Sequence, residues 1–153
     1  MKTFLRAAIA VLAIAAPTFA QAGNDLVGTW KMDASRSKIA GSSGASALFI
    51  IKYERVGDLL RETLSASNTE GSGKNTIDYP IDGRELANGT GDDRVMAKLV
   101  NREGALILQW RDDGGTFTRT LTISADRRTL TIVAHDSNPD TKGDDVLVLQ
   151  RQP

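Results

Sequence analysis

Arg119 is the residue whose setting most directly suggests chemistry. It lies in an alternating run, Thr116–Ser124, in register with Phe117 and Leu121 on the face that should point inward. A buried charge without a partner is costly, so this guanidinium needs an acid, a ligand or a path to water. Glu62, on the apolar face of its own run, is one acid that the pattern offers. Two interpretations stay open: a cation that anchors a ligand carboxylate inside the fold, or a structural cation that pairs with Glu62 or reaches water at a rim.

Four aromatic side chains share these inward faces and are candidates to line a ligand pocket. They are Tyr53, Tyr79, Trp110 and Phe117. Aromatic walls with a few polar tips suit small ligands. Aromatic residues make up only 5% of the chain, however, so the same four side chains are also needed to fill a core. We therefore weigh core packing above ligand contact for each of them.

The residues that could carry catalysis or bind a metal form no recognisable pattern. His135 is the single histidine and there is no cysteine, which excludes the common zinc clusters. A Ser-His-Asp triad lacks the Gly-x-Ser-x-Gly context. The aspartate pairs at 92–93, 112–113 and 144–145 lack the spacing of a calcium loop and are typical of solvated hairpin ends. We expect no cofactor and no metal.

A carboxylate pair for acid and base catalysis could still assemble in space. Its candidate members are Glu54, Glu62, Asp78 and Glu85. Sequence spacing alone does not place two of them together, so an enzyme stays the third of our functional hypotheses.

Short alternating runs separated by turn residues predict an all-β fold. We find nine such runs, at about 27–32, 47–55, 60–64, 77–81, 94–99, 106–110, 116–124, 130–134 and 146–151. Short connections favour pairing between neighbours in sequence. We therefore predict an antiparallel up-and-down meander of about eight to ten strands, closed into a barrel that removes the exposed edges. Pro80 cannot donate to a ladder, which places its strand at an edge, an end or a bulge.

The first residues have the build of a secretory signal peptide. Lys2 and Arg6 precede an apolar run, 7–16, and small residues end in Ala20-Gln21-Ala22. We predict a signal peptide over 1–22 and one barrel domain over 23–153. The apolar run is shorter than the roughly 20 residues that span a bilayer, and no cysteine is present to carry a lipid. A periplasmic or secreted protein without a membrane anchor is the expectation.

The charge of the mature chain gives no sign of a polyanionic partner. Cleavage removes two of the 19 basic residues and none of the 19 acidic residues, which leaves a net charge of −2. A nearly neutral chain of mixed charge is not expected to bind nucleic acid. We expect a monomer whose partner is a small hydrophobic or carboxylate-bearing ligand.

The chain resembles the lipocalin-like, or calycin-type, group, and more closely its small secreted bacterial β-barrel proteins, most of which have no assigned role. Gly28-Thr29-Trp30 is similar to the Gly-x-Trp signature of lipocalins, and the strand and turn patterns at 82–85, 119–126 and 129–131 extend the likeness. The resemblance implies that Trp30 closes the barrel floor and that Arg151 stacks over it. A guanidinium over an indole is worth about 0.5 to 2 kcal/mol.

These observations lead to three functional hypotheses. The first is a non-catalytic barrel that binds a small apolar or amphipathic molecule in a cavity opening away from Trp30. The second is an envelope interaction or inhibitor-like module with a filled barrel, which uses loops such as 34–46. The third is a small barrel enzyme of unknown reaction.

Overall fold

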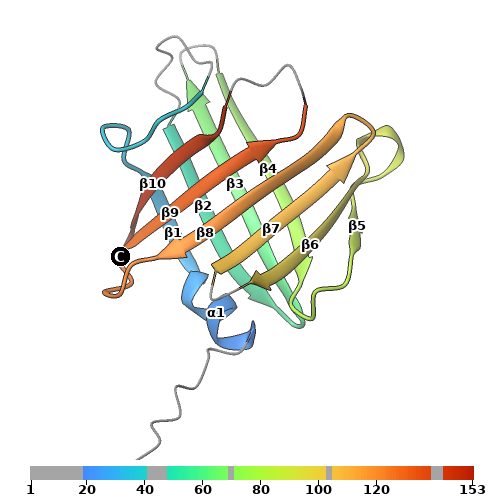
Figure 1. Ribbon diagram of the computed structural model, residues 1–153, viewed down its shortest axis with the longest axis horizontal. Helices are drawn as coiled ribbons and strands as arrows, with labels where there is room; N and C mark the ends of the chain where they lie inside the picture. Colours follow the sequence, from blue (N-terminus) through green and yellow to red (C-terminus); the bar gives the residue numbers. More distant parts are fainter. Residues whose placement is uncertain (1–18, 41–47, 69–70, 103–104, 139–142) are drawn as a thin grey trace, which may run out of the picture.

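A computed structural model describes residues 19–40, 48–68, 71–102, 105–138 and 143–153. One short helix precedes ten strands, and a single turn of 3-10 helix follows the fifth strand (Figure 1). The elements are α1 (Phe19–Leu26), β1 (Gly28–Met32), β2 (Leu48–Val56), β3 (Leu59–Asn68), β4 (Gly71–Pro80), β5 (Leu86–Asn88), η1 (Gly91–Asp93), β6 (Val95–Arg102), β7 (Ala105–Asp112), β8 (Gly115–Ile123), β9 (Thr129–Asp136) and β10 (Asp145–Arg151).

The ten strands form one antiparallel sheet in the order β4-β3-β2-β1-β10-β9-β8-β7-β6-β5. Every neighbouring pair is also adjacent in sequence except β1 and β10, the first and last strands, which pair with each other. The predicted all-β up-and-down meander is therefore confirmed, and the sheet curls until β4 approaches β5 and β6 in a nearly closed barrel.

The seam between β4 and β5 is bridged by a side chain instead of a backbone ladder. The Asn88 side-chain oxygen accepts from the Asp78 backbone N–H at 2.7 Å, and its nitrogen donates to the Asp78 carbonyl at 3.0 Å. One amide thus takes both hydrogen bonds that a neighbouring strand would have made to Asp78. Pro80 ends β4, the terminal strand at this seam, where its missing N–H costs no ladder bond.

Some local features differ from the sequence-based expectations. The connection between the predicted runs 60–64 and 77–81 is much shorter than expected, because β3 extends to Asn68 and β4 already begins at Gly71, its partner. The sequence did not predict this end of β4, because Gly71–Lys74 is polar, rich in glycine and exposed. The short β5 and helix α1 were not predicted. Helix α1 spans the proposed cleavage position after Ala22, and no helix among the described residues is long and apolar enough to cross a membrane.

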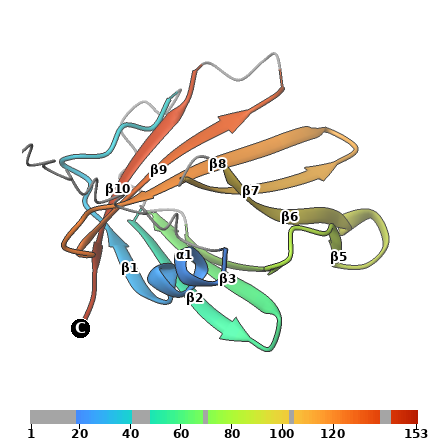
Figure 2. The same cartoon turned by 60° about the horizontal axis from the view of Figure 1, so that its bottom comes forward.

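One end of the barrel, which we call the closed end, is covered by α1 (Figure 2). Trp30 is fully buried there, and its indole N–H donates to the Leu26 carbonyl at 2.8 Å. The Arg151 guanidinium lies over the indole, 4.2 Å from the ring centroid, and donates to the carbonyls of Val27 and Asp25 at 2.7 and 2.6 Å. This single arginine therefore ties the last strand to the end of the helix.

Gly28 makes that approach possible. Its φ of +138° is one that side-chain-bearing residues rarely adopt, and a Cβ at this position would lie 2.7 Å from the Arg151 Nη1 atom. The residue two positions before the tryptophan must therefore be small enough to let the guanidinium pass. The buried core continues from this closed end into the barrel. Its fully buried residues include Tyr53, Leu60, Leu108 and Leu149.

Candidate functional site

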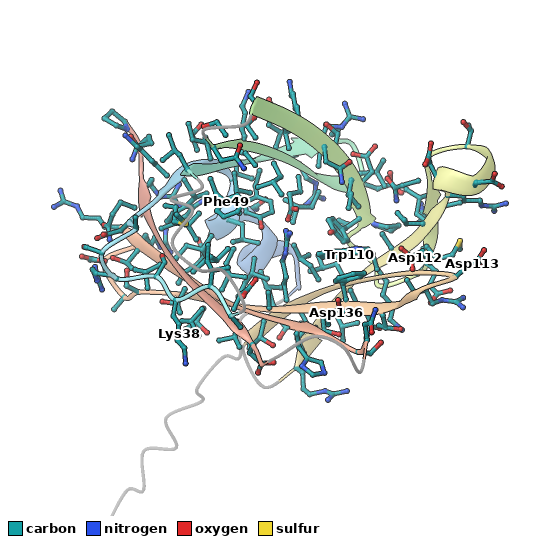
Figure 3. The ribbon with its side chains drawn as sticks, turned by 90° about the horizontal axis from the view of Figure 1, so that it is seen from above. Lys38, Phe49, Trp110, Asp112, Asp113 and Asp136 are labelled. Carbon is teal, nitrogen blue, oxygen red and sulfur yellow. The ribbon has the colours of Figure 1, made fainter. Side chains whose placement is uncertain are left out.

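The opposite end of the barrel, which we call the open end, carries the hollows that a ligand could enter. It is formed where β3, β7 and β9 finish and where β2, β4, β8 and β10 begin (Figure 1). Seen from above, Phe49 and Trp110 lie on opposite sides of this opening (Figure 3). The barrel therefore has one end fixed by packing and one end with room for another molecule.

The first hollow, which we call the Trp110 pocket, has a volume of about 280 Å³. Its walls come from β7, β8, β9 and the start of β10, and its rim from two loops. The lining residues are Ala40, Trp110, Phe117, Thr118, Arg119, Ala134, His135, Asp136, Gly143 and Asp145. It lies at the lower end of the size range of small-molecule sites, so it suits a small ligand or one end of a larger ligand.

The aromatic wall of this pocket follows from strand register. Trp110 and Phe117 are direct cross-strand partners on β7 and β8, and their rings stack with centroids 5.4 Å apart. Arg119, two residues further along β8, lies over the same indole at 4.6 Å. The Arg119 guanidinium thus occupies one face of the Trp110 ring. The stacked rings of Trp110 and Phe117 form a rigid apolar wall.

Arg119 meets Glu62 across the barrel interior. The Nη1 atom of Arg119 donates to Glu62 Oε1 at 2.6 Å, and the side chains are only 14% and 3% exposed. The other carboxylate oxygen, Oε2, accepts from the Tyr53 hydroxyl at 2.8 Å. The structure thus realises the ion pair that the sequence left as one of two alternatives. Burial by itself would lower the pKa of Arg119, but the neighbouring Glu62 charge and the two tyrosines raise it, so the guanidinium stays charged.

Tyr79 completes this polar cluster, which consists of Tyr53, Glu62, Tyr79 and Arg119. Tyr79 is fully buried on the inner face of β4, and its hydroxyl has no hydrogen-bond partner in the described structure. Burial, and then the Glu62 charge, raise the pKa of Tyr79 well above its ordinary value, and the same two causes act on Tyr53. Both phenols are therefore neutral, and the Tyr79 hydroxyl is an unused hydrogen-bonding group.

The six predicted ligand-contacting residues divide into two groups. Trp110, Phe117 and Arg119 line the Trp110 pocket, whereas Tyr53, Glu62 and Tyr79 lie in the buried cluster and do not line it. Arg119 is the single member common to both, because it contacts Trp110 on one side and Glu62 on the other.

Two acidic residues of the pocket were not among the predicted ones. Asp136 and Asp145 line its rim, and Asp145 Oδ1 accepts from the Ala40 backbone N–H at 2.7 Å. Asp136 follows Ile132 and Ala134 at every second position of β9. The alternation of this strand was therefore enough to predict that Asp136 lies on its inward face. Asp145 begins β10 directly opposite Ala134, a pairing that needs the register of the sheet.

A second hollow of about 450 Å³ lies on the other side of the opening, around Phe49, Ala66 and Gly73. These three residues are cross-strand neighbours on β2, β3 and β4. A Cβ at Gly73 would meet nothing within 4 Å, so the missing side chain contributes directly to the space. The hollow depends on how the sheet curls and on which residues of the three strands pair.

The residues weighed for catalysis are not assembled into a reactive group. His135 is exposed and pairs with Asp144 at 2.7 Å. Asp78 pairs with Arg61, Glu85 with Arg111, and Glu54 with Lys52, so three of the four candidate carboxylates are held by separate cations. The described residues contain no cluster of His, Cys, Asp or Glu suited to a metal ion. The loop proposed for protein contacts is described only over 34–40, and its remainder lies outside the described residues.

The ten antiparallel strands define an up-and-down β-barrel that is nearly closed. No protein-family model and no curated protein matches the sequence. Among solved structures, the chain is similar to a heat-soluble (SAHS) protein from Ramazzottius varieornatus, with a TM-score of 0.62 and 11% identity over 84% of this chain and 96% of that one. It is also similar to the fatty-acid-binding protein 1 of Echinococcus granulosus, with a TM-score of 0.57 and 11% identity over 85% and 99%.

A third similar structure is that of a Schistosoma mansoni fatty-acid-binding protein in complex with arachidonic acid. Its TM-score is 0.55 and its identity 16%, over 86% of this chain and 99% of that one. At this level of identity the likeness establishes the shared barrel fold and nothing about individual side chains.

Proposed function

We propose that this protein is a non-catalytic carrier that binds a small apolar or amphipathic molecule at the open end of its barrel. The observation that carries the proposal is the Trp110 pocket: a stacked aromatic wall with one partly exposed guanidinium at its inner end. Apolar walls with few convergent polar groups are what small-molecule sites use. Two of the structural neighbours are fatty-acid-binding proteins, which supports a lipid-like ligand.

The closed end has a structural role in this proposal. Trp30, Arg151 and Gly28 lie where α1, β1 and β10 meet, and the Trp30 indole is fully buried there. A ligand therefore enters from the end where Phe49 and Trp110 face each other. Arg119 orients the polar part of the ligand, while Trp110 and Phe117 contact its apolar part.

A periplasmic or secreted location forms part of the same proposal and rests on the sequence of residues 1–22. Cleavage after Ala22 would keep the contacts that fasten the remaining N-terminal segment. The carbonyls of Asp25 and Leu26, which accept from Arg151 and Trp30, both follow the cleavage position. Measuring the N-terminal mass of the protein from fractionated cells tests this, and a chain that keeps its first 22 residues would contradict it.

Native mass spectrometry of the protein purified from its own compartment tests the carrier function. The expected result is a co-purifying small molecule that is absent from an Ala134→Phe variant, because Ala134 lines the pocket opposite Arg119 on the neighbouring strand. Val133→Phe is the matched control, since Val133 is adjacent but 36% exposed. Release of the same molecule from both variants, or its absence from the wild type in repeated preparations and in reconstitution with lipid extracts, would contradict the proposal.

An interaction or inhibitor-like module is the second candidate, and one observation favours it. The barrel below Arg119 is filled by large, fully buried side chains, among them Trp30, Tyr53 and Tyr79. A protein that uses only its loops would need no cavity. Capture of a protein partner by the wild type that the Ala134→Phe variant captures equally well would favour this second function.

A further inference from the structure

The charge around the Trp110 pocket points to the chemical class of the ligand. This inference rests on the proposed carrier function and narrows it. Of the described residues that line the pocket, Arg119 is the one permanent cation, and its charge is already matched by Glu62 at 2.6 Å. An anionic ligand would therefore find no unmatched positive charge at the inner end of the pocket.

The ion pair is difficult to open. Glu62 is 3% exposed, so a ligand carboxylate that took Arg119 for itself would leave a second carboxylate buried without its cation. Uncompensated buried charge is among the costliest states in a protein. Tyr53 would still donate to Glu62 Oε2, but one neutral hydrogen bond does not replace a guanidinium.

The described part of the rim contains acidic side chains. Asp136 and Asp145 line the entrance, and His135 beside them is paired with Asp144. Asp145 Oδ1 accepts from the Ala40 backbone N–H at 2.7 Å, so among the described lining residues this side chain offers an anion no cation. A second anion is disfavoured at the inner end of the pocket, where the Glu62 carboxylate is buried and water screens least.

Arg119 nevertheless keeps hydrogen-bonding capacity. In the described structure only its Nη1 atom has an acceptor, so Nε and Nη2 remain as donors. Nearby, the Tyr79 hydroxyl has no partner. The inner end of the pocket thus combines a balanced charge with the unused donors of Arg119, and the Tyr79 hydroxyl lies behind it in the buried cluster.

We infer that the inner end of the Trp110 pocket takes an uncharged polar head group with an acceptor oxygen, such as an amide, ester or alcohol, in preference to a carboxylate. The acceptor oxygen receives a hydrogen bond from Arg119 without disturbing Glu62. The apolar tail lies along Trp110 and Phe117. The ligand class is accordingly a neutral amphiphile.

A set of ligands with one tail and different heads tests this inference. Octanamide, octanol, octanoate and octylamine are titrated into the wild-type protein near neutral pH by calorimetry. The expected order places octanamide and octanol above octanoate by about tenfold or more. Octanoate binding as tightly as octanamide would overturn the inference while leaving the carrier function intact, and so would a preference for octylamine. If none of the four binds, the carrier function itself fails for ligands of this class.

The Glu62→Gln variant provides a sharper test, because it should reverse the preference. With the carboxylate gone, the buried guanidinium becomes an unmatched cation, and octanoate should gain affinity relative to octanamide by about tenfold. Glu54→Gln is the matched control, because it removes the same charge from the exposed side of β2 and should leave the order unchanged. An unchanged order in Glu62→Gln would overturn the inference.

If the Glu62→Gln variant does not fold, the pH dependence of ligand binding to the wild-type protein tests the same inference. Octanoic acid becomes neutral as the pH falls through the pKa of its carboxyl, at about 4 to 5 as for a Glu side chain. Its apparent affinity should then rise towards that of octanamide. Octanamide reports any effect of the rim residues His135, Asp136 and Asp145, and of Asp144, which pairs with His135. Parallel pH curves for both ligands would contradict the inference.

Discussion

Glu62 on β3 and Arg119 on β8 meet at 2.6 Å inside the barrel, although β2, β1, β10 and β9 lie between their strands in the sheet. The contact crosses the interior of the barrel from one wall to the other. It joins the wall that carries the two tyrosines to the wall that carries Trp110. It also divides the interior into a filled part towards Trp30 and a hollow part towards the open end.

Removing one partner of this pair should cost far more than removing both. Arg119→Met leaves the Glu62 carboxylate buried without its cation and should lower the free energy of unfolding by about 3 to 5 kcal/mol. The double variant Arg119→Met, Glu62→Met removes both charges and should recover most of that loss. Urea denaturation of the wild type, the two single variants and the double variant measures the coupling. Additive losses would show that the two side chains do not depend on each other.

Both tyrosines of the chain should resist ionisation until the protein unfolds. Burial, and then the Glu62 charge, raise the pKa of Tyr53 and Tyr79 in the folded state well above the unfolded value of about 10. Each phenol therefore favours the folded state below about pH 10, and this contribution is lost as the pH rises further. Phenolate absorbance and circular dichroism should change together in one alkaline transition. A phenolate signal near pH 10 in a folded protein would contradict the burial of these side chains.

Loss of the side-chain hydroxyl should change the free energy of unfolding in opposite directions at Tyr53 and Tyr79. Tyr53→Phe removes a hydrogen bond to a buried carboxylate and should destabilise the fold by about 1.5 to 3 kcal/mol. Tyr79→Phe removes a buried hydroxyl without a partner and should stabilise the fold by about 1 kcal/mol. The pair is its own control, since both changes delete one oxygen. Equal destabilisation would mean that Tyr79 is hydrogen-bonded in solution.

The seam between β4 and β5 should depend on one amide. Asn88→Ala removes both side-chain hydrogen bonds to the Asp78 backbone and should accelerate hydrogen exchange of the Asp78 amide, at a cost of about 1 to 2 kcal/mol. Asn75→Ala, at an exposed position of β4, is the control and should leave that exchange rate unchanged. Slow exchange at Asp78 in Asn88→Ala would show that the seam is closed by other contacts.

The buried indole at the closed end should matter for stability alone. Trp30→Ala should lower the free energy of unfolding by about 3 to 5 kcal/mol, because a fully buried tryptophan leaves a large cavity. The order of affinities across the four octyl ligands should stay the same. A changed order with unchanged stability would mean that ligands enter from the closed end.

Periodicity was sufficient to predict the meander because almost all strand pairs join neighbours in sequence. It also placed Arg119 and Glu62 on inward faces. Sequence could not decide that they meet, because that contact depends on how far the sheet curls between β3 and β8. It missed β5, whose three residues are too few to show alternation, and it missed the hollow at Gly73, which depends on strand pairing.

The central claim is that a ligand binds beside Trp110 and not beside Trp30, and the two tryptophans of the chain make it directly measurable. Each indole N–H gives a separate signal in a nitrogen–proton correlation spectrum. On titration with octanamide, the signal of Trp110 should shift progressively while that of Trp30, buried and bonded to Leu26, stays in place. A shift of Trp30 alone, or saturation of binding without movement of Trp110, would contradict the proposed site.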